Sequence, residues 1–301
     1  MDLITDKINE FQEFYDGVLK KSDHRVANWL LMGSFAPTLA LTALYLVFVF
    51  VVPKIMAKRE AMDCKRALMV YNFGLIILNL HICTELFINS YHLGYSYICQ
   101  PVTYSDNPRE IRIAKALWWF YFSKVLEMLD TVFFILRKKN NQVSFLHVYH
   151  HASMFPIWWI GVKWVAGGQS FFGAMMNSFI HVLMYTYYGV SALGPQFQKF
   201  LWWKRYLTRI QLIQFVIGIT HAIQSLVFGC DFPAWMHWAL IFYGFSILFL
   251  FLNFYFHAYI KAQRDKKQKH VKNGKPQTND FMHYNRFWPR VHKTFSDLSL
   301  Y

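Results

Sequence analysis

The chain has 301 residues, of which 55% are hydrophobic, 20% aromatic and only 16% charged, and its mean hydropathy is positive. This composition is typical of a membrane protein and excludes an ordinary pair of soluble domains. The formal net charge of +14 would suit a nucleic-acid-binding protein only if the basic residues formed a binding surface, which their distribution argues against.

Apolar segments of about 20 residues, the length that crosses ~30 Å of hydrocarbon, lie near 29–52, 68–90, 115–136, 145–166, 170–193, 206–229 and 234–258. We therefore expect an all-α membrane protein with seven transmembrane helices. Residues 29–258 would form the membrane domain, between an N-terminal tail (1–28) and a C-terminal tail (259–301). Since 1–28 holds six acidic residues and no apolar run of signal-peptide length, no cleaved signal is expected.

Basic residues are divided unequally between the two sides of the membrane. Loops 53–67, 137–144 and 194–205, together with the tail after residue 258, contain 21 Lys and Arg, whereas the opposite tail and loops contain 7. The positive-inside rule therefore predicts a lumenal N-terminus and a cytosolic C-terminus. Topology accounts for the charge, so no nucleic-acid partner is expected. The basic tail 259–301 is polar enough to be disordered.

The first two spans differ in polar content. The segment 29–52 has no Asp, Glu, Lys, Arg or His and is interpreted as a plain anchor. The second span carries His81 and Glu85, four residues apart on one helical face. These two side chains either hold helices together through hydrogen bonds or line a site.

The third span is the more informative, because Lys124, Glu127, Asp130 and Thr131 fall within about 120° of one helical face. On a scale of membrane-insertion free energy, the three charged residues of this span are unfavourable by about 8 to 10 kcal/mol. Its Leu, Ile, Phe and Val residues are favourable by only about 3 to 7 kcal/mol. This face must therefore be hidden in a bundle interior or along a water-accessible cavity.

The next span begins with three histidines, His147, His150 and His151, at its cytosolic end. On a helix these positions lie within about 100° of arc, so we expect the imidazoles to converge. An ionisable group inside a membrane span indicates a functional site by default. The alternative is that the histidines hydrogen-bond neighbouring helices.

The fifth and sixth spans add further polar residues to the same cytosolic half. Asn177 and His181 lie four residues apart, and Gln211 and Gln214 either line a site or join helices. A substrate with a charged head and a long alkyl tail fits such a position, because each buried methylene gains ~0.8 kcal/mol. The basic residues near the opening either bind phosphates or only mark cytosolic loops; they are Lys138, Lys139, Lys204, Arg205 and Arg209.

The four cysteines are too few and too scattered for a metal site, and no metal is expected. Cys99 and Cys230 both fall in loops assigned to the lumenal side, where oxidising conditions allow a disulfide between them. Cys64 is assigned to the cytosol and Cys83 to the second span.

Four ordered motifs resemble those of the fatty acid elongase family, the membrane condensing enzymes of very-long-chain fatty acid synthesis. They are KVLEMLDT (124–131), HVYHH (147–151), NSFIHVLMYTYY (177–188) and RIQLIQF (209–215). The resemblance covers about residues 29–258. The sequence between the motifs is most similar to the vertebrate-type branch that handles very long saturated and polyunsaturated acyl chains.

The resemblance implies that helices two to seven form a barrel around a narrow acyl tunnel. It implies condensation of a long-chain acyl-CoA with malonyl-CoA to 3-ketoacyl-CoA, CO2 and CoA, without a bound cofactor. The product would pass to a separate ketoacyl reductase, dehydratase and enoyl reductase in the endoplasmic reticulum membrane. Assembly with itself or with other elongases is left open. The C-terminal residues SDLSLY contain no dilysine retrieval signal. Residence in the endoplasmic reticulum therefore rests on the resemblance, on the interior Lys266 and Lys267, or on partner enzymes.

The family pattern also implies roles for individual residues. His150 would be the nucleophile, since histidine forms covalent intermediates, and Glu127 or Asp130 would orient an imidazole. His147 and His151 would transfer protons. The implied donors to an enolate oxygen are Asn177, His181, Gln211 and Lys124. The residues implied in substrate binding are Gln211, Gln214, Tyr187, Tyr188 and the five basic residues named above.

Two other functions compete with this interpretation. A membrane di-iron oxygenase also has HxxHH motifs, but it needs about eight histidines in three clusters. This chain has one cluster and isolated His81, His181, His221, His237 and His257. A seven-helix receptor or transporter would explain the helix count and leave the carboxylate and histidine faces without a purpose.

Overall fold

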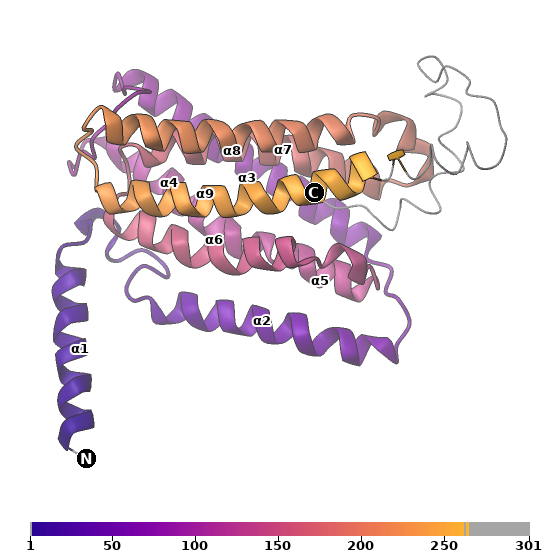
Figure 1. Ribbon diagram of the computed structural model, residues 1–301, viewed down its shortest axis with the longest axis horizontal. Helices are drawn as coiled ribbons and strands as arrows, with labels where there is room; N and C mark the ends of the chain where they lie inside the picture. The colour runs from indigo at the N-terminus through magenta and orange to yellow at the C-terminus, as the bar shows by residue number, and fades with distance from the viewer. Residues whose placement is uncertain (1, 262, 265–301) are drawn as a thin grey trace.

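The structure is a computed structural model, described here for residues 2–261 and 263–264 (Figure 1). Within these residues the chain forms helices and no strand, as expected for an all-α protein. The α-helices are α1 (Asp2–Lys20), α2 (Ala36–Ala57), α3 (Lys65–His92), α4 (Pro108–Glu127), α5 (Leu129–Leu136), α6 (Phe145–Trp164), α7 (Ser170–Ala192), α8 (Lys204–Val227) and α9 (Ala234–Tyr255). The short helices are η1 (His24–Val26), η2 (Asn140–Gln142), η3 (Pro195–Phe200) and the π-helix η4 (Phe256–Lys261). Most of the tail predicted to be disordered lies outside the described residues.

Four helices in the described part are long and apolar enough to cross a membrane: α2, α3, α8, and α9 together with η4. The protein is therefore a membrane protein. Helices α4 to α7 coincide with the remaining predicted spans. Their sequences contain the charged, histidine and aromatic residues identified above. These residues lower the mean hydropathy, so composition alone does not mark the helices as membrane spans.

Two predicted boundaries were wrong. The first span was expected from residue 29, but α2 begins at Ala36, with Pro37 in its first turn, where a missing N–H is tolerated. The predicted continuous span 115–136 is divided at Met128 into α4 and α5. Because the Thr131 N–H donates to the Met128 carbonyl at 3.2 Å, the chain takes a tighter three-residue step there. Lys124 and Glu127 thus belong to one helix and Asp130 to the next.

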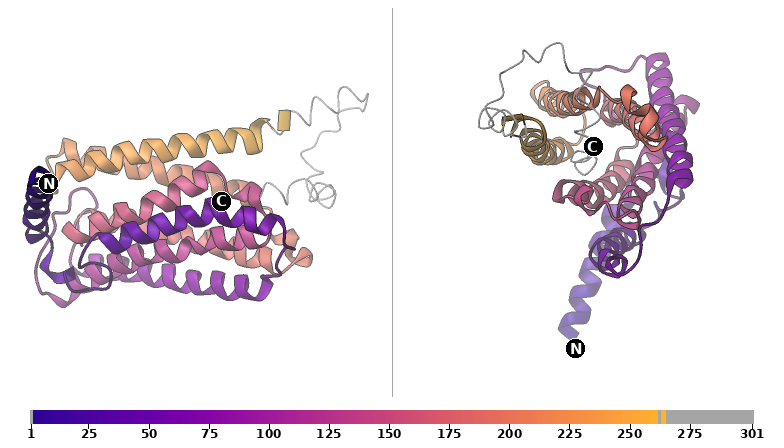
Figure 2. Two further views of the ribbon diagram at one scale, coloured as in Figure 1. Left: turned by 90° about the horizontal axis from the view of Figure 1, so that it is seen from below. Right: turned by 90° about the vertical axis from the view of Figure 1, so that its right-hand side faces the viewer.

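The long helices run side by side, as Figure 2 shows from two directions. Helix α3 packs against α4 and α7, α8 packs against α7 and α9, and α6 packs against α4 and α9. Helix α2 lies on the outside, against α5 and α6. Aromatic residues fill the contact between α4 and α6, where the rings of Tyr121 and Phe155 stack with centroids 4.8 Å apart.

The two ends of the bundle differ in chemistry. At one end Cys99, between α3 and α4, forms a disulfide with Cys230, between α8 and α9. We call this the disulfide end. The Gln169 side chain, before α7, accepts from the Gln100 N–H and donates to the Ile98 carbonyl. The opposite end, which carries the loops 137–144 and 194–205, is called the basic end.

Candidate active site

A buried carboxylate on α4 is the centre of the site. Glu127 is 1% exposed, and its two oxygens accept from the Lys124 ammonium at 2.9 and 3.1 Å. The Ser123 hydroxyl also donates to Glu127 Oε1, at 3.1 Å. Since removing charges from water is costly, a buried pair persists only when its remaining hydrogen-bonding groups are satisfied. The i, i+3 and i, i+4 spacing on α4 satisfies them.

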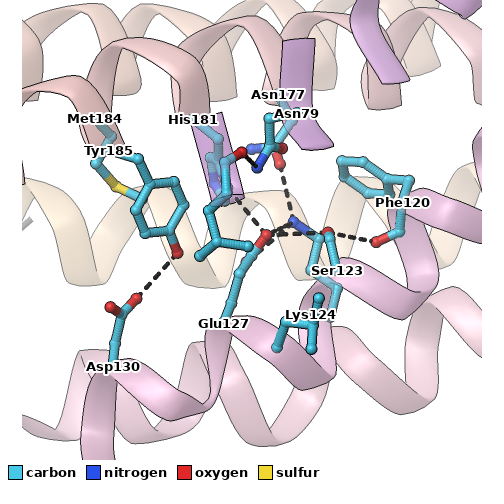
Figure 3. A network of polar contacts seen from close by, with 12 residues as sticks. Asn79, Phe120, Ser123, Lys124, Glu127, Asp130, Asn177, His181, Met184 and Tyr185 are labelled. Atoms are coloured by element: carbon cyan, nitrogen blue, oxygen red, sulfur yellow. Dashed lines mark hydrogen bonds and ion pairs between the residues drawn. The ribbon is translucent and has the colours of Figure 1, made fainter. Parts of the chain in front are cut away.

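Helix α7 completes this network from the facing side (Figure 3). His181 Nδ1 lies 3.2 Å from Glu127 Oε1, and Asn177 Oδ1 accepts from Lys124 Nζ at 3.4 Å. Because an ionised carboxylate only accepts, Nδ1 is the donor and His181 Nε2 carries the lone pair. Glu127 therefore fixes the tautomer of His181, an orienting role that the sequence had predicted for a carboxylate beside an imidazole.

Asp130, from α5, has a different partner. Its Oδ2 accepts from the Tyr185 hydroxyl, on α7, at 3.0 Å (Figure 3). Asp130 and Glu127 thus both face α7, but Glu127 bonds to a histidine and Asp130 to a phenol.

The three histidines of α6 are positioned by a capped helix start. The Ser144 side chain accepts from the His147 N–H, and this N-cap sets where the helix begins. The ring centroids of His147 and His151 are 4.4 Å apart, and those of His150 and His151 are 5.4 Å apart.

The His147 ring lies against that of His151, and its hydrogen bonds run toward α5 and α2. Its Nε2 lies 2.7 Å from Thr131 Oγ1, which lies 3.0 Å from the Tyr45 hydroxyl on α2. The three imidazoles thus lie together along α6, as expected, but only His150 and His151 line the pocket described next. Tyr45 was not identified from the sequence, because a single tyrosine in an apolar span gives no signal that its hydroxyl reaches Thr131.

A pocket lies beside Glu127, His181 and the histidines of α6, whereas Lys124, Asp130 and His147 are not among its lining residues. Glutamines of α8 close one side: Gln211 Nε2 lies 3.7 Å from Met184 Sδ, and Gln211 Oε1 is buried without a hydrogen-bond partner in the described part of the chain. The pocket is lined by Glu127, His150, His151, Asn177, Ile180, His181, Met184, Tyr185, Gln211, Gln214, Phe215 and Phe251. The lining thus combines polar side chains with the apolar Ile180, Met184, Phe215 and Phe251, which suits a polar reacting group attached to a hydrocarbon chain.

The remaining predicted binding residues do not line this pocket. Arg205 and Arg209 lie at the basic end, where both Nε atoms donate to the Tyr255 hydroxyl, at 3.2 and 3.0 Å. The Tyr187 ring packs on Trp203, with centroids 5.2 Å apart. The others outside the pocket are Tyr188, Lys138, Lys139 and Lys204.

The polar pair of the second span is also away from the pocket. Glu85 accepts from Arg112 at 2.6 and 2.8 Å, and His81 is exposed. Asn79 of the same helix lies instead near the Glu127 network (Figure 3). Of the two functions considered for His81 and Glu85, the structure therefore supports a helix-joining contact for Glu85.

Comparisons with known proteins place the chain in a family. The model of the GNS1/SUR4 (ELO) family matches residues 30–267. The chain is 58% identical over 274 residues to very long chain fatty acid elongase 4 of Homo sapiens, covering 91% of this chain and 87% of that protein. It is 46% identical to very long chain fatty acid elongase 2 of Mus musculus, with 90% and 93% covered. It is 45% identical to very long chain fatty acid elongase 5 of Xenopus laevis, with 87% and 88% covered.

The matched residues 30–267 extend over the helices that form the pocket and contain the positions of all four motifs noted in the sequence. The chain therefore belongs to the ELO family, described as the GNS1/SUR4 family.

Proposed function

We propose that this protein is a 3-ketoacyl-CoA synthase of fatty acid elongation. It condenses a long-chain acyl-CoA with malonyl-CoA, releasing 3-ketoacyl-CoA, CO2 and CoA. The observation that carries the proposal is a pocket lined both by His150, His151 and the Glu127–His181 pair and by apolar side chains. The relatives named as very long chain fatty acid elongases support the same reaction.

The first half-reaction is transfer of the acyl group to the protein. A ring nitrogen of His150 attacks the thioester carbonyl, the carbon–sulfur bond breaks, and CoA leaves with the electron pair. The displaced ring proton passes through His151, whose ring lies against His150, to the sulfur. An acyl-imidazole is reactive enough to be attacked in turn, which is the advantage of a covalent intermediate.

The second half-reaction forms the carbon–carbon bond. Malonyl-CoA loses CO2, and the electron pair of the broken bond becomes an enolate. The enolate carbon attacks the acyl carbonyl, the carbon–nitrogen bond to His150 breaks, and the departing ring nitrogen takes a proton from solvent to restore the imidazole. The enolate oxygen needs preorganised donors, and the amide of Gln211 and that of Asn177 line the pocket. Lys124, 2% exposed and bonded to Glu127, contributes a fixed positive charge nearby.

We also propose the arrangement that delivers these substrates. The contacts among α3, α4, α6, α9, α8 and α7 support a seven-span topology in which six helices enclose a narrow acyl tunnel. The basic end would face the cytosol and the disulfide end the lumen of the endoplasmic reticulum. CoA phosphates would bind near Lys138, Lys139, Lys204, Arg205 and Arg209. A reductase, a dehydratase and a second reductase would act on the product, and assembly with other elongases is compatible with the exposed apolar helices.

The test is an elongation assay with purified protein, a long-chain acyl-CoA and labelled malonyl-CoA, without oxygen and with an iron chelator. The proposal predicts labelled 3-ketoacyl-CoA two carbons longer than the substrate. A folded protein that gives no such product over a range of chain lengths would refute it, and bound iron would then favour the oxygenase. Ligand-dependent signalling or flux without product would favour a receptor or transporter.

A further inference from the structure

Helix α1 has a position unlike that of the other long helices. It lies at the disulfide end and runs across the direction of the bundle (Figure 1). Seen along the bundle, it projects outward past α2 (Figure 2, right). If the bundle helices cross a membrane, a helix with this direction lies along the membrane surface.

The C-terminal end of α1 is fixed to the bundle. The Trp164 indole donates to the Val18 carbonyl at 3.3 Å, and the Phe35 N–H donates to the Tyr15 hydroxyl at 3.0 Å. These contacts join α1 to the end of α6 and the start of α2. The direction of α1 is therefore set by attachment to two helices of the bundle.

The segment after α1 strengthens this attachment. Asp23 and Arg25 form an ion pair of 2.6 Å whose side chains are completely buried. Arg25 also donates to the Thr103 carbonyl at 2.9 Å and to the Ala166 carbonyl at 3.0 Å. One guanidinium thus joins the N-terminal segment to the α3–α4 and α6–α7 connections.

The composition of α1 is amphipathic. Phe14, Tyr15 and Val18 lie on one side of the helix, and the sequence continues the same spacing with apolar residues at positions 4, 8 and 11. The Phe14 side chain is 69% exposed, so the described protein does not cover it. Lys7 falls within the apolar arc, but its ammonium bonds to Glu10 at 2.9 Å, and a long stem allows such a charge to reach the polar edge.

The charge of α1 indicates which kind of lipid surface it suits. Residues 2–20 contain five acidic and two basic residues, whereas helices that bind anionic lipid carry Lys and Arg on the polar face. An excess of carboxylates is repelled by an anionic surface and tolerated by a zwitterionic one.

We propose that α1 is an interfacial helix, which lies on a zwitterionic lipid surface at the disulfide end with the Phe14 side immersed and the acidic side in water. Helix α2, directly beside it, exposes Leu39, Leu44, Val47 and Phe50, which contact acyl chains if α2 spans the membrane. Interfacial helices bury their apolar side about 5 to 10 Å into the headgroup and acyl boundary.

The test uses the full-length chain with Cys64 and Cys83 replaced by serine, in vesicles of zwitterionic phosphatidylcholine carrying bromine on its acyl chains. A bimane label is attached at Phe14→Cys or, as a matched control, at Glu13→Cys on the acidic side. Both side chains are exposed, so neither substitution removes a buried contact. Bromine should quench the label at position 14 severalfold more than the label at position 13.

Equal quenching at the two positions, or none at position 14, would overturn the proposal. Absence of quenching together with a cross-link between copies at position 14 would assign the apolar side to a second copy of the chain. Replacing part of the lipid with phosphatidylserine that carries the same bromination should weaken quenching at position 14. Unchanged or stronger quenching there would overturn the zwitterionic assignment.

Discussion

Replacing Glu127 by Gln should destabilise the protein strongly, because it leaves the Lys124 ammonium buried without its counter-ion. The two side chains are 1% and 2% exposed, so solvent screens them little. Removing one member of a buried ion pair costs about 3 to 5 kcal/mol. The measurement is the unfolding free energy in a denaturing-detergent titration of the purified protein.

The double variant Lys124→Met with Glu127→Gln separates the charge effect from the loss of a carboxylate. Because it buries no unpaired charge, it should lie within about 1 to 2 kcal/mol of the parent protein. It should nevertheless lose at least about 100-fold in elongation rate, since the group that orients His181 has lost its charge.

The same Glu→Gln change at Glu85 is the control. Its partner Arg112 is 57% exposed, so we expect a loss of only about 0 to 1 kcal/mol. If the double variant is no more stable than Glu127→Gln alone, or if Glu85→Gln costs as much as Glu127→Gln, the reasoning from burial is refuted.

Three further predictions follow from other contacts. Thr131→Val should cost about 1 to 3 kcal/mol of stability, because it leaves the buried His147 nitrogen without this hydrogen bond, and a detergent titration that shows no loss would contradict it. When the protein is alkylated without a reductant, its intact mass should show two modified thiols, because Cys99 and Cys230 are paired; four modified thiols would rule the disulfide out. Replacing Cys99 by Ser should lower the free energy of unfolding by about 2 to 4 kcal/mol. Arg209→Ala should raise KM for acyl-CoA with kcat nearly unchanged if it binds a phosphate, and a fall in kcat alone would contradict that role.

The sequence predicted those features that depend on local pattern. Apolar length located the long helices from α2 to α9, whereas the side-chain cap from Ser144 before the histidines was not predicted. The polar faces of α4 and α7 predicted that Glu127 and His181 would lie inside the bundle, because a charged face cannot be left in hydrocarbon.

Features that depend on tertiary contacts were missed. The segment before Ala36 is as apolar as the helix that follows, so hydropathy gives no sign of where α2 begins. The division at Met128 has no Pro or Gly to mark it. Tyr45 reaches Thr131 only because α2 packs against α5, and no periodicity within one span contains that information.

The most direct test of the account is whether His150 carries the acyl group. The protein is mixed with a long-chain acyl-CoA without malonyl-CoA, quenched rapidly and analysed by intact mass and peptide fragmentation, with His92→Ala, an exposed position at the disulfide end, as the control variant. The account predicts one added acyl group on His150, absent in His150→Ala, present in His92→Ala, and removed when malonyl-CoA is supplied. An acyl group on another residue, or full elongation by folded His150→Ala, would contradict it.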